Sequence, residues 1–185
     1  MDAAARKRVL DYVKPLAVGL DGVTNYGDVE RMVSASQAIA GGNGAPPLDE
    51  ELLFLLAVFS GQEKWVSRMG HRSRTEIFLA SLGISPRTVQ RLFRGLSRLE
   101  APATPEEEIV HDAVTLEAMG AYGIARGLAD AYRERLDILE MASAIEEAAN
   151  AGLKTSRAEQ LAAPRRELMR AFVRRLREEH AEFSR

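Results

Sequence analysis

The sequence predicts an all-α protein, and three observations support that class. Apolar residues recur at spacings of three and four through every long segment. No run of alternating β-branched residues is long enough to suggest a strand. Helix start signals recur, as in Ser85-Pro86 and Thr104-Pro105, where a capping hydroxyl precedes a proline at the first helical position. With 185 residues, 46% hydrophobic and 28% charged, we expect residues 1–185 to form one helical domain.

The first half of the chain predicts three helices. We expect a first helix over residues 1–20, kinked at Pro15, and a second helix from about Asp28. The second helix turns five side chains inward: Val29, Met32, Val33, Ser36 and Ile39. After the linker "GGNGAPP", the segment "LDEELLFLLAVFSG" is apolar nearly all round, so we expect it to be the central buried helix, ended by Gly61.

The remaining helices are marked by their start and stop signals. The segment "WVSRMGHRSRTEIFLASLG" is closed by Gly83, and "SPRTVQRLFRGL" begins at the Ser85 cap. In "TPEEEIV", Thr104 caps the next helix and Glu107 completes a capping box. A helix-rich stretch broken near "NAGLKTS" leads to a C-terminal helix over 164–185. On one face of that helix we place Leu168, Phe172, Leu176, His180 and Phe183.

The composition excludes several kinds of chemistry and location. The chain has no cysteine, which rules out disulfides, Cys-ligated zinc and thiol catalysis. No run approaches the roughly 20 apolar residues of a membrane span, and the N-terminus lacks the apolar stretch of a signal peptide. We therefore expect a cytoplasmic protein without a membrane partner. The oligomeric state stays open, and a homodimer is compatible with the sequence.

The charges are unevenly distributed along the chain, although the net charge is only -2. The segment from Lys64 to Arg98 has eight basic residues and one acidic residue, and the segment from Thr104 to Gln160 has twelve acidic and five basic residues. One interpretation is that helices pack with opposite charges facing each other. The other is that the basic segment binds a small anion, because arginine matches phosphate and carboxylate in geometry. Without a glycine-rich phosphate loop or a ladder of basic and aromatic residues, we expect no nucleic-acid partner.

The sequence contains no recognisable catalytic module. The sequence contains no G-x-S-x-G elbow, no H-E-x-x-H, no Walker loop and no calcium-binding loop, and we expect no cofactor. The only histidines are His71, His111 and His180, the last of which has a surface or packing role as its simplest explanation.

The segment "DAVTLEAMGAYGIAR", Asp112 to Arg126, resembles the closing motif of the HD-domain metal-dependent phosphohydrolases. In that family an Asp-Ala-Asp-x-Leu-Asp segment precedes a Gly-Ala-x-Gly-Ile-Ala-Arg run. Here Val114 and Glu117 stand where the second and third acids are usual. The stretches "YGDVERMV", "LLFLLAVFSG" and "HRSRTEIFLASLG" fit other family motifs in the same order. The resemblance covers residues 20 to 185 and implies a single HD-domain-like helical bundle.

The metal ligands that the resemblance implies are mostly replaced. The family's metal-bridging His-Asp doublet aligns with Val58 and Phe59, which have no lone pair to offer a cation. The first histidine position falls at Asp28 and a later one near Leu96, so only His71 and Asp112 keep matching ligand types. Because a divalent metal needs about four to six donors, we expect no metal in this chain.

Two surviving residues each have a functional and a structural interpretation. His71 is a candidate general acid or base, or else a helix cap. Asp112 is a candidate for orienting His71 or binding substrate, or else the N-cap of a helix that begins near Ala113.

The neighbours of these residues complete the candidate site. His111 is a further candidate catalytic residue, and its structural alternative is a partly exposed position at a helix end. Arg72 and Arg74 are the candidate anion-binding residues, and Val58 and Phe59 would form an apolar wall for a substrate. For Asp28 the structural alternative is the N-cap of the second helix.

Three functional hypotheses follow. The first is a metal-independent HD-like protein that binds or converts a small organic molecule, anionic or neutral, in its helical cavity. The second is a non-catalytic binding or regulatory protein. The third is a metal-dependent phosphohydrolase with a reduced ligand set of Asp28, His71 and Asp112.

Overall fold

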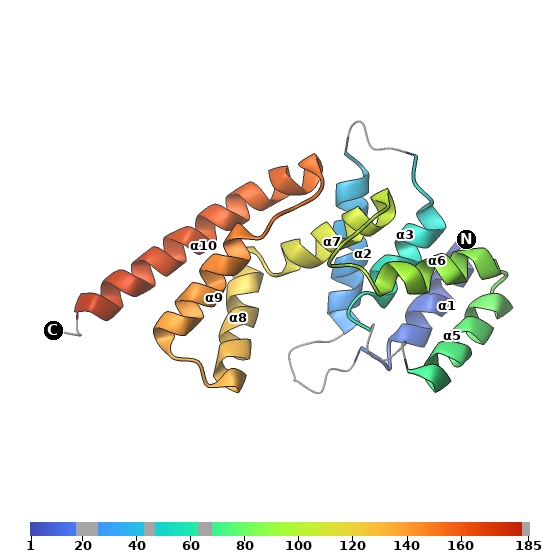
Figure 1. Ribbon diagram of the computed structural model, residues 1–185, viewed down its shortest axis with the longest axis horizontal. Helices are drawn as coiled ribbons and strands as arrows, with labels where there is room; N and C mark the ends of the chain where they lie inside the picture. Colours follow the sequence, from blue (N-terminus) through green and yellow to red (C-terminus); the bar gives the residue numbers. More distant parts are fainter. Residues whose placement is uncertain (18–25, 43–46, 63–67, 183–185) are drawn as a thin grey trace. The chain divides into compact units, whose positions relative to one another are not determined.

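The computed structural model describes residues 1–17, 26–42, 47–62 and 68–182, and its regular structure in these ranges is helical, as Figure 1 shows. The predicted all-α class is therefore confirmed. The chain divides into two compact units, Met1–His111 and Asp112–Arg185. The expectation of one domain stays a prediction. None of the helices in the described ranges is long and apolar enough to cross a membrane.

The first unit is organised around α3. Its helices are α1 (Ala3–Val13), α2 (Tyr26–Ala40), α3 (Glu50–Phe59), α5 (Met69–Ser81), α6 (Pro86–Leu96) and the start of α7 (Pro105–Glu117). Every side chain from Leu52 to Phe59 is buried, and α3 packs against α1, α2 and α6. The prediction of a central buried helix is confirmed, because a helix apolar on all faces needs neighbours on all sides.

One helix end and one helix start in the first unit differ from the predictions. α1 ends at Val13, so Pro15 follows the helix and does not kink it, as expected for a residue that cannot continue a helical hydrogen-bond ladder. Asp28 lies in the first turn of α2 and is not its N-cap. There its charge faces the positive end of the helix dipole. Residues 18–20 of the predicted first helix, part of the predicted linker (43–46) and residues 65–67 of the segment before α5 lie outside the described residues.

The capping predictions hold at Ser85 and hold in part at Thr104. The Ser85 hydroxyl accepts a hydrogen bond from the Thr88 N–H, with Pro86 as the first helical residue. Thr104 Oγ1 accepts from the Glu107 N–H at 3.4 Å, but the Glu107 carboxylate accepts from the Ala103 N–H at 2.8 Å and does not close the capping box.

Opposite charges do meet within the first unit. Glu107 is 3% exposed and accepts two hydrogen bonds from the Arg98 guanidinium, at 3.0 and 2.7 Å. This contact raises the pKa of Arg98 above its ordinary value. Glu106, also buried, accepts from the Asp49 N–H and lies 3.8 Å from Arg91. The interpretation of mutually neutralised helices is thus supported for Arg91 and Arg98.

The second unit contains the end of α7, from Asp112 on, and three further helices. These are α8 (Gly120–Glu134), α9 (Ile138–Asn150) and α10 (Ser156–Glu182), which pack against one another. The predicted break near "NAGLKTS" is confirmed. α10 begins eight residues before the predicted start, however, and runs through Pro164. Its buried residues are Ala158, Ala162, Met169 and Val173, whereas Leu168, which we placed on the apolar face, is 47% exposed. Phe183, which was placed on that face, lies outside the described residues.

Two glycines shape the turn between α7 and α8. Gly120 has φ +76°, a conformation that side-chain-bearing residues rarely adopt. A Cβ on Gly123 would lie 2.1 Å from the Ala118 carbonyl oxygen. The tight turn explains why glycine occupies both positions, and no ligand is needed to account for them.

Candidate functional site

The first unit contains a cavity of about 430 Å³ between α1, α2 and α3. Its walls are mixed in character. Four lining residues have polar or charged side chains: Arg6, Ser36, Gln37 and Glu50. The rest of the lining is apolar or small: Val33, Ala40, Gly41, Leu48, Leu53, Phe54 and Ala57. Sites for small molecules commonly have this size and this combination of apolar walls with a few polar groups.

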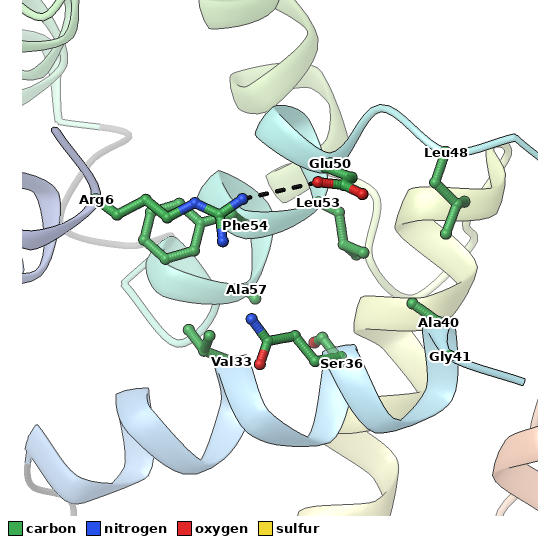
Figure 2. Close-up of a pocket in the computed structure, with 11 residues that line it drawn as sticks. Arg6, Val33, Ser36, Ala40, Gly41, Leu48, Glu50, Leu53, Phe54 and Ala57 are labelled. Atoms are coloured by element: carbon green, nitrogen blue, oxygen red, sulfur yellow. Dashed lines mark ion pairs between the residues drawn. The ribbon is translucent and has the colours of Figure 1, made fainter. Parts of the chain in front are cut away.

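Helical periodicity explains why these residues share one space. On α2, lining positions recur at Val33, Ser36 and Ala40, and on α3 they recur at Glu50, Leu53 and Ala57. Spacings of three and four place each set on one helix face, and the two faces oppose each other across the cavity (Figure 2). Small side chains at Ser36, Ala40 and Ala57 leave the space open where the two helices would otherwise pack tightly.

Ser36 places a polar atom in an otherwise buried position of the cavity wall. Its side chain is 1% exposed, and its Oγ has no hydrogen-bond partner among the residues that the structure describes. A helical serine ordinarily bonds back to a carbonyl of the preceding turn or faces solvent. A buried hydroxyl without a partner costs about 1 to 3 kcal/mol, so a ligand that supplied the partner would recover that free energy.

Charged and aromatic groups meet at one side of the cavity. The Arg6 guanidinium lies 5.2 Å from the centre of the Phe54 ring, and its Nη2 is 3.9 Å from Glu50 Oε2. Figure 2 shows Arg6 over the Phe54 ring with its end turned toward Glu50. Because the Glu50 side chain is 85% exposed, this ion pair is weak.

Val58 and Phe59, the predicted apolar wall, lie in the core of the first unit. Both side chains are 0% exposed, and neither lines the cavity between α2 and α3. The Phe59 ring packs at a tilt against Tyr12, with ring centres 6.4 Å apart. Packing accounts for both residues, and their contact with a ligand stays a prediction.

Asp112 is held by an internal network of the second unit. Its side chain is 0% exposed and accepts hydrogen bonds from the Lys154 N–H, the Thr155 N–H and the Thr155 hydroxyl, at 2.8, 2.8 and 2.7 Å. It lies within α7, so the prediction that it caps a helix starting near Ala113 was wrong. Asp112 instead fixes the segment that leads into α10.

His71, Arg72 and Arg74 lie on α5 and do not line the cavity. His71 is in the first turn, inside the helix and not at its cap position. Arg72 Nε donates to Glu76 at 3.0 Å, and its guanidinium lies 4.6 Å from the centre of the Phe93 ring. Arg74 is exposed. The roles of His71 in catalysis and of both arginines in anion binding stay predictions.

His111 lies within α7 and not at a helix end. Its Nδ1 donates to the Leu99 carbonyl oxygen at 2.8 Å. This bond fastens the loop after α6 to α7, which is a structural task. A catalytic role for His111 stays a prediction.

The donor atoms do not fit the metal site that the family resemblance implies. Val58 and Phe59 offer no lone pair, and both carboxylate oxygens of Asp112 already accept hydrogen bonds. Across the described part of the chain, no three His, Asp or Glu side chains gather in a group that could hold an ion. We therefore derive no chemistry through a metal.

Sequence reasoning missed most of the cavity residues. It placed Val33 and Ser36 inward, and burial of Ser36 is confirmed, but it did not single out Arg6, Gln37, Glu50 or Phe54. The sequence pattern that could have indicated the cavity is a set of polar and small residues at helical spacing on two consecutive helices. That pattern becomes a cavity only once the two faces are known to oppose each other.

Comparison with solved structures extends the fold assignment to the whole chain. The Listeria innocua protein Lin1889 superposes with a TM-score of 0.79 at 19% identity, covering 98% of each chain. Bacillus subtilis YpgQ, solved in complex with ADP, superposes with a TM-score of 0.73 at 19% identity, covering 95% of each chain. A Lactobacillus plantarum protein gives a TM-score of 0.72 at 16% identity, covering 98% of this chain and 99% of that one.

At these identities the similarity establishes the fold alone. No protein-family model matches the sequence, and no curated protein matches it. The chain is therefore an all-α protein that shares its fold, over nearly its full length, with bacterial proteins of low sequence identity.

Proposed function

We propose that this protein is a divergent HD-superfamily member that binds a small organic molecule, without a metal ion, in the cavity between α2 and α3. The observation that carries the proposal is the cavity itself, which combines a volume of about 430 Å³ with a buried, unpartnered Ser36 hydroxyl. An empty core defect would be lined by apolar atoms, whereas this wall also presents a guanidinium, a carboxylate and a carboxamide.

Binding is better supported than conversion. The ionisable side chains in the lining are Arg6 and Glu50, and neither is paired with a nucleophile or a histidine in the cavity. General acid–base catalysis needs a group whose pKa lies near the working pH, a condition that His71 meets by residue type but from outside the lining. A binding or regulatory role therefore needs no catalytic group beyond the residues that line the cavity, whereas conversion would need one.

One protein with this fold, Bacillus subtilis YpgQ, has been solved in complex with ADP, a small phosphate-bearing molecule. This supports the general idea of a small organic ligand for the present chain. It does not identify that ligand, because the two chains are 19% identical.

The proposal is tested by a thermal-shift screen of metabolite-like compounds, run in chelator and again with Mn²⁺. We expect compounds that raise the melting temperature equally in both conditions. The matched variants are Ala40→Leu, which fills the cavity, and Ala38→Leu, which adds the same atoms to the exposed side of α2. Hits should disappear in Ala40→Leu and persist in Ala38→Leu.

Three results would count against the proposal. Hits that persist in Ala40→Leu would place the ligand elsewhere, and a screen without hits would remove the evidence for binding. Near-stoichiometric Mn²⁺ in the purified protein, measured by elemental analysis, would show that the metal ligands were misidentified. Turnover of a hit that is lost in His71→Ala would establish conversion in place of simple binding.

A further inference from the structure

We propose that the ligand of the α2–α3 cavity is an aromatic organic acid, with its anionic group on Arg6, its ring against Phe54 and a polar substituent on Ser36. This inference rests on the proposed function and adds the chemical class of the ligand. Three features of the wall carry it: an available cation, an apolar slot beside an aromatic ring, and a buried hydroxyl.

The cation is Arg6. Its side chain is 35% exposed, and among the described residues its ion pair is the 3.9 Å contact with Glu50, which is longer than a hydrogen bond. The planar guanidinium therefore keeps donors that can form a bidentate contact with a carboxylate or phosphate. On binding an anion, Arg6 would replace its weak, solvent-exposed contact with Glu50 by a stronger contact with the ligand.

Glu50 is the residue that such an anion must displace. Its side chain is 85% exposed, so it can turn into solvent at little cost. The neighbouring acids are already engaged, since Asp49 pairs with Arg91 and Glu51 pairs with the amino terminus of Met1. Within the described part of the chain, Arg6 and Glu50 are thus the charges at this side of the cavity that lack a strong partner.

The apolar walls favour a flat ring. Phe54 is 7% exposed and Leu53 is 6% exposed, and both line the cavity opposite Val33 of α2. Arg6 lies beside the Phe54 ring, so a ligand whose acid binds Arg6 would have its ring close to Phe54. An aromatic ligand would gain offset stacking with Phe54 in addition to burial of its apolar surface.

The hydroxyl of Ser36 sets the polar substituent. Among the described residues the buried Ser36 Oγ has no hydrogen-bond partner. A ligand hydroxyl or carbonyl beside it would therefore form a hydrogen bond without breaking an existing one on the protein. The ligand class is therefore a ring with an acid at one end and a small polar group at the other.

Three matched probes test these contacts separately: 2-naphthoate, its neutral analogue 2-naphthamide, and 6-hydroxy-2-naphthoate. Affinities are measured by calorimetry on the full chain. On wild type we expect 2-naphthoate to bind about tenfold more tightly than 2-naphthamide, as one charge-assisted hydrogen bond implies. The hydroxyl compound should bind more tightly than 2-naphthoate.

Variants then assign each preference to a residue. Arg6→Gln should abolish the preference for acid over amide, and Arg6→Lys should retain part of it. Glu50→Gln should strengthen binding of 2-naphthoate by about twofold to fivefold, because it removes the competing carboxylate. Ser36→Ala should remove the gain from the hydroxyl group and leave the affinity for 2-naphthoate unchanged.

Some outcomes overturn the ligand class but leave the proposed function standing. An equal affinity for acid and amide on wild type, or an unchanged acid preference in Arg6→Gln, has this effect if Ala40→Leu still blocks binding. Failure of all three probes also overturns the aromatic-acid assignment, and hits of another class in the metabolite screen would then show that the proposed function survives. Probes that bind equally well to Ala40→Leu would overturn both.

Discussion

The carboxylate of Asp112 in α7 accepts hydrogen bonds from both the backbone N–H and the hydroxyl of Thr155, at 2.8 and 2.7 Å. Thr155 Oγ1 in turn accepts from the Ala158 N–H in the first turn of α10. A single buried side chain therefore holds the residue that caps the longest helix of the second unit. The position at which the family resemblance implies a metal ligand has a structural task here.

We predict that Asp112→Asn destabilises the protein by about 2 to 4 kcal/mol, measured by urea unfolding. The amide has one acceptor oxygen where the carboxylate has two, and its NH₂ group would face N–H donors. Glu147→Gln, an exposed neutralisation on α9, is the control and should change the free energy of unfolding by less than about 0.5 kcal/mol. A neutral effect of Asp112→Asn would contradict the structural role.

Two glycine substitutions test how closely helices pack, one in α6 and one in α8. A Cβ on Gly95 would lie 2.8 Å from Leu56 Cδ2 and 3.3 Å from Glu107 Cγ, so Gly95→Ala should destabilise by about 1 to 3 kcal/mol. In α8 a Cβ on Gly127 would meet Ile145 Cγ1 at an ordinary 3.6 Å. Gly127→Ala should therefore stabilise by about 0.5 to 1 kcal/mol through helix propensity. Thermal unfolding distinguishes the two signs.

The ion pair between Glu159 and Arg166 predicts a pH dependence in the acid range. The hydrogen bond from Arg166 lowers the pKa of Glu159 below its ordinary value of 4.5. A lowered folded-state pKa stabilises the protein above pH 4.5, and this contribution is lost as the pH falls through the folded-state pKa. Glu159→Gln should therefore lower the melting temperature at neutral pH, and the difference from wild type should shrink below pH 4.5.

The control for this titration is Glu167→Gln, an exposed substitution on the same helix. It should show a small difference from wild type that does not depend on the Arg166 contact. If both variants showed the same pH profile, general charge effects would explain the result, and Arg166 would have no special part in it.

Two phenylalanines of α3 separate cavity lining from core packing. Phe54 lines the cavity and Phe59 does not, although both are buried at 7% and 0% exposure. Phe59→Leu should destabilise by about 1 to 2 kcal/mol and leave ligand affinity within about twofold of wild type. Phe54→Leu should weaken binding of an aromatic ligand, as calorimetry would measure. If Phe59→Leu weakened binding and Phe54→Leu did not, the ligand would instead bind on the side of α3 that carries Val58 and Phe59.

Helix starts and ends were predicted well where they depend on a capping residue, a proline or a glycine within a few positions. Ser85 and Pro86 begin α6, Gly83 follows α5, and the break before α10 falls within "NAGLKTS". The prediction for α10 was less accurate, because Pro164 was interpreted as a helix start. A proline is also tolerated inside a long helix when packing of Ala158, Ala162 and Met169 outweighs one lost hydrogen bond.

The site was predicted less completely than the fold. Residue types and the family resemblance made His71, His111 and Asp112 candidates for catalysis, but only the folded structure shows that His111 bonds to Leu99 and that Asp112 bonds to Lys154 and Thr155. The residues of the cavity were inconspicuous in the sequence, since arginine, serine and alanine on helix faces usually have no ligand.

The sequence by itself determined the all-α class, the capped starts of α6 and α7 and the buried position of α3, because helical periodicity and caps depend on neighbours within about four residues. It also determined that Val58 and Phe59 cannot bind a metal, because that is a property of their side chains. The tertiary structure alone decided what each polar residue contacts. Asp112 meets groups 42 and 43 positions along the chain, and Arg6 meets Phe54 through the packing of α1 on α3. Such contacts depend on how helices pack, which no local pattern specifies.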